Sequence, residues 1–88
     1  MHQPSTMIRC RLGILLAQEN LRRAEAGLPR LSQNELAAET KVAVAVVNRL
    51  ATNNQHRVDY KTMDRLCRFF NVQPGDLFEY IPEGAAGN

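Results

Sequence analysis

The segment from Leu31 to Leu50, LSQNELAAETKVAVAVVNRL, constrains the fold more than any other part of this 88-residue chain. Ser32 is a typical helix N-cap, and Glu35 three positions later completes a capping box. Apolar residues then continue at helical spacing to the end of the segment. The segment therefore predicts two short helices around a tight turn, the first ending near Thr40 and the second covering about residues 43–52.

The second of these helices has an ambiguous sequence. Residues 42–46 alternate between valine and alanine, so local propensity alone would favour a strand. We find no second strand candidate with which such a strand could pair. Val47 and Leu50 also continue the i, i+3 spacing of a buried helical stripe. We therefore expect a helix here and a chain without a sheet.

A first helix is predicted over about residues 7–26. Thr6 can cap its beginning, and Gly27 followed by Pro29 can end it. Its last turns, RRAEA, are polar and can project outward. The apolar face of this helix is expected to consist of Ile8, Leu12, Leu15 and Leu16.

Two further helices follow a polar loop. Asp59 is the expected N-cap of the fourth helix. Pro74 suits the first turn of a short fifth helix, Gly75 to Tyr80, which buries Leu77 and ends at Pro82. The apolar face of the fourth helix is predicted to hold Met63, Leu66, Cys67 and Phe70.

These elements define one all-α domain of five helices over residues 7–82. Residues 1–6 are expected to form a disordered N-terminal extension, and residues 83–88 a flexible tail. The formal net charge of +2 is mild, with most basic residues in the first half of the chain. This bias suits a polyanionic partner but is equally typical of a solvated surface.

Several classes of protein are disfavoured by the composition. No apolar run approaches the ~20 residues of a membrane span, so we expect no membrane partner. The opening MHQPST lacks the charged-then-apolar order of a secretory signal, which favours a cytoplasmic protein. Cys10 and Cys67 have no C-x-x-C spacing and are expected to be reduced core residues rather than a disulfide or metal pair.

The sequence also lacks the marks of a catalytic or metal site. His2 and His56 have no second ligand at metal spacing. We find no nucleophile beside a base, no glycine-rich phosphate loop and no paired carboxylates. We therefore expect no enzyme, no cofactor, no metal and no small-molecule substrate.

Four motifs, taken in order, resemble one family. The opening MIRCRL (residues 7–12) has the form M-I-x-x-x-L, and LSQNELA (31–37) has the form L-[ST]-Q-x-E-L-A. TMDRLC (62–67) is followed by PGDLFEYIP (74–82), of the form P-x-D-L-x-E-Y-x-P. The chain thereby resembles the short stand-alone Cro/C1-type (XRE-like) helix-turn-helix regulators of bacteria and phages. The resemblance implies a five-helix lambda-repressor-like fold and DNA binding.

The chain departs from this family in three places. About eight to ten residues around 21–30 have no counterpart between the first two helices. Lys41 stands where a turn glycine is expected, a position that favours positive φ and costs another residue roughly 1 kcal/mol. The helix that should read DNA is mostly valine and alanine.

The resemblance implies that the second helix lies across the DNA backbone and the third enters the major groove. Gln33 then matches a position that clamps a phosphate, although it could simply decorate a helix start. Arg49 could contact guanine and Asn48 could contact adenine. Alternatively, Asn48 simply faces solvent near the end of a helix, and Arg49 forms a salt bridge to a neighbouring glutamate. Val44 and Ala45 could reach only thymine methyl groups.

The polar loop of residues 53–57 matches the second phosphate-contacting segment of the family. Its backbone amides, asparagines and arginine are a plausible phosphate cradle, and a plain solvated loop is the alternative. The complete set of candidate DNA-contacting residues is Gln33, Ala43, Val44, Ala45, Asn48, Arg49, Asn53, Asn54, His56 and Arg57.

Two functions remain open at this stage. The first is a sequence-specific regulator that binds double-stranded DNA, as a homodimer on a two-fold site because one small domain makes few base contacts. The alternative is a protein-interaction module, antitoxin-like or partner-binding, that kept the fold and lost DNA readout. In either case the extra segment around residues 21–30 is a candidate for partner contacts or dimerisation.

Overall fold

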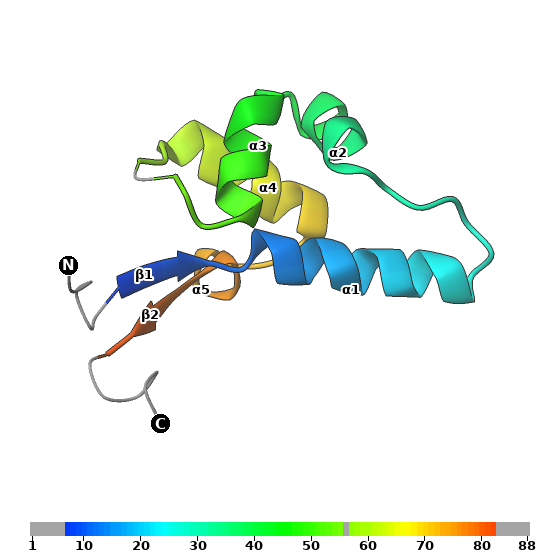
Figure 1. Ribbon diagram of the computed structural model, residues 1–88, viewed down its shortest axis with the longest axis horizontal. Helices are drawn as coiled ribbons and strands as arrows, with labels where there is room; N and C mark the ends of the chain where they lie inside the picture. Colours follow the sequence, from blue (N-terminus) through cyan, green and yellow to red (C-terminus); the bar gives the residue numbers. More distant parts are fainter. Residues whose placement is uncertain (1–6, 56, 83–88) are drawn as a thin grey trace.

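The computed structural model describes residues 7–55 and 57–82 of the chain (Figure 1). His56, the predicted extension (1–6) and the predicted tail (83–88) lie outside the described residues. The described chain contains the five predicted helices, together with two short strands that pair with each other. In chain order the elements are β1 (Met7–Cys10), α1 (Leu12–Glu25), α2 (Gln33–Thr40), α3 (Val44–Ala51), α4 (Tyr60–Phe70), α5 (Pro74–Leu77) and β2 (Phe78–Ile81).

The prediction that the chain has no sheet was wrong. β1 and β2 pair antiparallel, with Met7 opposite Ile81 and Cys10 opposite Phe78. Arg9 and Glu79 face each other across the ladder and form an ion pair of 2.6 Å between Nη2 and Oε2. Aromatic and β-branched residues favour strands, and opposite charges placed directly across a ladder add to its stability.

The sheet shortens both helices that were predicted at the ends of the domain. The first helix begins at Leu12 rather than near residue 7, and the predicted cap Thr6 lies outside the described residues. Ile8 is 66% exposed in β1, so its assignment to the apolar face of that helix was wrong. The fifth helix is Pro74–Leu77 and does not reach Tyr80, because the residues after Leu77 pair with β1 instead.

Local capping signals set most helix ends as predicted. Asp59 caps α4 by accepting a hydrogen bond from the Thr62 backbone N–H at 2.8 Å. Gly27 follows the end of α1 with a φ of 73°, a conformation that glycine adopts without a steric penalty. Pro74 occupies the first turn of α5, where its missing N–H costs nothing.

Each helix contributes one fully buried side chain to a single core. These side chains are Leu12, Leu36, Val47, Leu66 and Leu77. α1 and α3 pack closely at Gly13, where an added Cβ would lie 3.1 Å from the Ala51 carbonyl oxygen. The core therefore fixes α3 against α1 and α2, with one face of α3 left to solvent.

Both cysteines are free thiols, as predicted. Cys10 is buried and Cys67 is half-buried, and in each case burial is the main cause that raises the pKa of the thiol. Of the predicted apolar face of α4, only Leu66 is fully buried. Within the described residues, no helix is long and apolar enough to cross a membrane.

Candidate nucleic-acid interface

The beginning of α2 is fixed by a complete capping box. The Glu35 backbone N–H donates to Ser32 Oγ at 3.0 Å, and the Ser32 N–H donates to Glu35 Oε1 at 2.8 Å. Hydrogen bonding of the Glu35 carboxylate to the Ser32 backbone N–H is the largest cause that lowers the pKa of Glu35. Hydrogen bonding to the Ser32 side chain comes next, and the nearby charges of Arg23 and Arg30 contribute less. Gln33 is the first residue of the helix and is half-buried, at the position predicted for a phosphate contact.

The turn between α2 and α3 is held from both sides. Lys41 has φ 60° and ψ 34°, so the predicted positive φ is confirmed at a residue that is not glycine. Its N–H donates to the Ala37 carbonyl, which ends α2. Arg65 Nη1, from α4, donates to the Lys41 carbonyl oxygen at 2.9 Å. These contacts fix the angle at which α3 leaves the turn.

α3 divides cleanly into a buried and an exposed side. Val47 and Leu50 are buried, as their spacing predicted. The candidate base-contacting residues all lie on the exposed side: Ala43 at the N-cap, then Val44, Ala45, Asn48 and Arg49. The prediction about the outward face of this helix is therefore confirmed.

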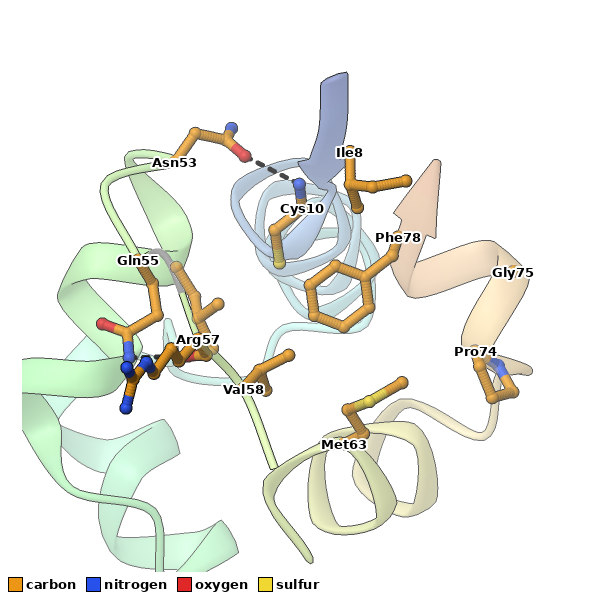
Figure 2. Close-up of a pocket in the computed structure, with 11 residues that line it drawn as sticks. Ile8, Cys10, Asn53, Gln55, Arg57, Val58, Met63, Pro74, Gly75 and Phe78 are labelled. Atoms are coloured by element: carbon orange, nitrogen blue, oxygen red, sulfur yellow. Dashed lines mark hydrogen bonds between the residues drawn. The ribbon is translucent and has the colours of Figure 1, made fainter. Parts of the chain in front are cut away.

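Among the residues that the structure describes, Arg49 does not form the salt bridge to a glutamate that was considered as an alternative. Its Nε donates to Oε1 of Gln55 at 2.6 Å, so its partner is a neutral amide. Gln55 in turn donates from Nε2 to the Arg57 carbonyl oxygen at 2.7 Å (Figure 2). The sequence placed Gln55 in the polar loop without assigning it this contact.

The loop after α3 is tied to the rest of the domain through Asn53. This residue has φ 61°, and its Oδ1 accepts a hydrogen bond from the Cys10 backbone N–H at 2.7 Å (Figure 2). The Asn53 and Asn54 backbone amides donate to the Leu50 and Arg49 carbonyls at the end of α3. These two N–H groups are thus engaged inside the protein, which leaves side chains as the phosphate donors at these positions.

Asn54 and Arg57 are both exposed, whereas His56 lies outside the described residues. Asn54 Nδ2 donates to Thr52 Oγ1 at 3.1 Å, which fixes its amide close to the end of α3. Arg57 uses its backbone carbonyl for the Gln55 contact, so that contact leaves its guanidinium available. The predicted cradle can therefore draw on the exposed side chains of Asn54 and Arg57, whereas the Asn53 and Asn54 backbone amides are already engaged.

The loop also forms one wall of a cavity of about 590 Å³. Figure 2 shows Ile8, Val58, Met63 and Phe78 around this space, with Cys10 on β1 beside the Asn53 contact. The loop is thus joined to β1 by the Asn53 contact and lies across this cavity from Met63 of α4.

The segment between α1 and α2 is tied back to α1 by the side chain of Asn20, a contact that was not predicted from the sequence. Asn20 Nδ2 donates to the Leu31 carbonyl at 2.9 Å, and the Leu31 N–H donates to Asn20 Oδ1 at 2.6 Å. An asparagine side chain can thus pair with a backbone amide as a second strand would. Figure 1 shows the end of α1 and this connection at the opposite end of the molecule from the sheet, with Leu21 61% exposed.

An α2–turn–α3 unit packed on α1 and α4, with α3 exposed along one side, defines a helix-turn-helix domain. A family model of the Cro/C1-type HTH DNA-binding domain matches residues 20–83, and the chain belongs to that family. A comparison with curated proteins found no match. The family assignment confirms the all-α helix-turn-helix class and identifies the chain as carrying a DNA-binding domain.

Proposed function

We propose that this protein is a sequence-specific transcription regulator that inserts α3 into the major groove of double-stranded DNA. One observation carries the proposal. The side of α3 opposite the buried Val47 and Leu50 is uncovered along its whole length, from Ala43 to Arg49. A helix that is exposed on one side and followed by a polar loop has the geometry required to enter a groove.

Base recognition falls on two polar side chains. Arg49 presents a guanidinium that can pair bidentately with guanine, and Asn48 presents an amide that can pair with adenine. Val44 and Ala45 offer only apolar contact with thymine methyl groups. Each bidentate pair is worth ~1–3 kcal/mol of discrimination, so the direct readout of one copy is limited to a few base pairs.

Phosphate contacts supply affinity and register in this proposal. Gln33 lies in the first turn of α2, where unpaired backbone amides and the positive end of the helix favour an anion. Asn53, Asn54 and Arg57 extend the same role to the loop after α3, and His56 remains a prediction from the sequence.

A homodimer on a two-fold site follows from this limited readout. Half-sites one helical turn apart double the base contacts without any change in the monomer. Sequence-dependent DNA shape adds discrimination at positions that no side chain touches.

A second candidate function rests on the apolar character of the same surface. Val44 is 41% exposed between Ala43 and Ala45, which is an unusual composition for a groove-reading helix. A protein-interaction module, antitoxin-like or otherwise, would use this surface for a partner chain and make little use of DNA sequence.

Selection of bound duplexes from a random DNA pool distinguishes the two candidates. A regulator should enrich a two-fold symmetric sequence, whereas an interaction module should enrich nothing. Affinity for the enriched duplex should fall about a hundredfold between 50 and 200 mM salt if a dimer neutralises four phosphates. Binding that does not respond to salt in this range would rule out the phosphate contacts.

A further inference from the structure

The Gln55 side chain is held at both of its polar atoms. Its Oε1 accepts from Arg49 Nε at 2.6 Å, and its Nε2 donates to the Arg57 carbonyl oxygen at 2.7 Å. Gln55 is half-buried, whereas Arg49 on α3 is exposed. The Gln55 side-chain amide therefore links Arg49, the strongest candidate for base recognition, to the backbone of the loop that holds the candidate phosphate contacts.

We propose that Gln55 is a positioning residue that sets the base specificity of DNA binding by fixing the guanidinium of Arg49. This inference rests on the proposed function. It adds a determinant that does not itself touch a base, and that lies outside the helix in the groove.

The chemistry of the guanidinium explains how the hydrogen bond between Gln55 and Arg49 affects base recognition. A guanidinium carries five N–H donors in a rigid planar fork. Because Nε is engaged by Gln55, the two terminal nitrogens of Arg49 remain available as a pair of hydrogen-bond donors. Such a pair matches the N7 and O6 acceptors of guanine. Because the partner is a neutral amide rather than a carboxylate, the full positive charge of Arg49 stays available to DNA.

The second hydrogen bond determines which way the amide faces. The Arg57 carbonyl can only accept, so the NH₂ group of Gln55 must point toward it. The amide oxygen is then left for Arg49. The Arg57 carbonyl thus orients the Gln55 side-chain amide, and that amide orients the Arg49 guanidinium.

The loop that carries Gln55 is itself fixed at its beginning. Asn53 Oδ1 binds the Cys10 N–H on β1, and the Asn54 N–H donates to the Arg49 carbonyl at 2.7 Å. A long arginine side chain loses rotamer freedom on binding, and a side chain ordered in advance loses less. Gln55 therefore orders the Arg49 side chain in the protein that is not bound to DNA.

The test compares Gln55→Met, which keeps the side-chain length and removes both hydrogen bonds, with Gln18→Met on the exposed surface of α1. Each protein is measured on the duplex selected by the wild type and on duplexes with one substituted base pair. Arg49→Ala identifies the base pair that Arg49 reads. Gln55→Met should lower discrimination at that base pair at least threefold, and change affinity for unrelated DNA less than twofold. Gln18→Met should match the wild type.

The double variant Gln55→Met/Arg49→Ala should discriminate no worse than Arg49→Ala alone, because the two residues act through one contact. A further measurement needs no DNA. In the free wild-type protein, the Arg49 Nε–H NMR signal should be protected from solvent exchange, and Gln55→Met should remove that protection.

Three outcomes overturn the inference while leaving the proposed function intact. Full discrimination by Gln55→Met shows that Arg49 needs no support, and equal weakening on every duplex shows that Gln55 acts only through the shape of the loop. An unprotected Arg49 Nε–H in the wild type removes the contact itself. If the wild type enriches no sequence while the Arg49 Nε–H is protected, the proposed function fails, and the inference that rests on it fails as well.

Discussion

The Cys10 backbone N–H donates to Asn53 Oδ1 at 2.7 Å, which joins residues 43 positions apart in the sequence. Cys10 is buried, so its N–H has little access to water as a substitute partner. The contact ties the first strand of the domain to the loop that follows the exposed helix. The position of that loop therefore depends on the sheet.

Asn53→Ala should lower the free energy of unfolding by about 2 kcal/mol, because a buried donor left unsatisfied costs ~1–3 kcal/mol. The backbone at residue 53 also has φ 61°, which alanine adopts poorly. Asn53→Gly should therefore be less harmful than Asn53→Ala by about 1 kcal/mol. Urea unfolding followed by circular dichroism measures both values. Equal losses for the two variants would show that the backbone conformation contributes nothing.

Lys41→Gly should raise the free energy of unfolding by about 1 kcal/mol, because glycine adopts the observed φ of 60° without a steric penalty. The Arg65 hydrogen bond survives the change, since it uses the backbone carbonyl of residue 41. Lys61→Gly, in the first turn of α4, is the matched control and should lower stability, by less than the ~0.8–1.0 kcal/mol that separates glycine from alanine in a helix interior. Thermal unfolding of both variants gives the sign, and a destabilised Lys41→Gly would contradict the strain argument.

Asn20→Ala should lower the free energy of unfolding by about 2 kcal/mol, because it removes two partly buried hydrogen bonds to the Leu31 backbone. Asn34→Ala, on the exposed surface of α2, should change stability by less than about 0.5 kcal/mol. Amide hydrogen exchange provides a local check. The Leu31 N–H should exchange slowly in the wild type and rapidly in Asn20→Ala, and rapid exchange in both would exclude the contact.

The pH dependence of stability should report on Glu19. Hydrogen bonds from Arg22 and Arg23 lower the pKa of Glu19 from its ordinary value of 4.5 to about 2. A carboxyl group with a depressed folded-state pKa contributes stability above pH 4.5 and loses it as the pH falls toward 2. The stability difference between the wild type and Glu19→Gln should therefore shrink over that range in urea titrations. In an Arg22→Gln/Arg23→Gln background the same difference should be small at every pH.

Arg49→Ala and Arg57→Ala should affect DNA binding differently. Arg49→Ala should reduce discrimination at one base pair by about tenfold, within the range of a single bidentate contact. Arg57→Ala should weaken binding to all sequences alike and reduce the salt slope of the bound dimer by about 2, about 1 for each copy. Fluorescence anisotropy on selected and substituted duplexes measures both effects. Uniform weakening by both variants would make Arg49 a phosphate contact.

The features that could be predicted from the sequence depend on nearby residues. The Ser32–Glu35 capping box and the Asp59 cap each follow from chemistry within about four positions. The positive φ at Lys41 was expected from the resemblance to the family, which has a turn glycine at this position. The outward face of α3 follows from the spacing of Val47 and Leu50, since buried residues on a helix determine which others face solvent.

The features that were missed depend on distant partners. Ile8 has the spacing of a helical residue relative to Leu12, and only the pairing with β2 turns that stretch into a strand. The contacts of Gln55 with Arg49 and of Asn20 with Leu31 need a defined loop path before the side chains can meet. Helical periodicity contains no information about such paths.

The pairing of β1 with β2 has a consequence for the order of events during synthesis. Arg9 meets Glu79 only after a further 70 residues have been added. At ~5–20 residues per second, the strand that leaves the ribosome first waits about 4 to 14 s for its partner. The Asn53 contact of β1 can form sooner, once the 43 residues after Cys10 have been added. The strand pairing at β1 is therefore completed only after α1, α2, α3 and α4 have all been synthesised.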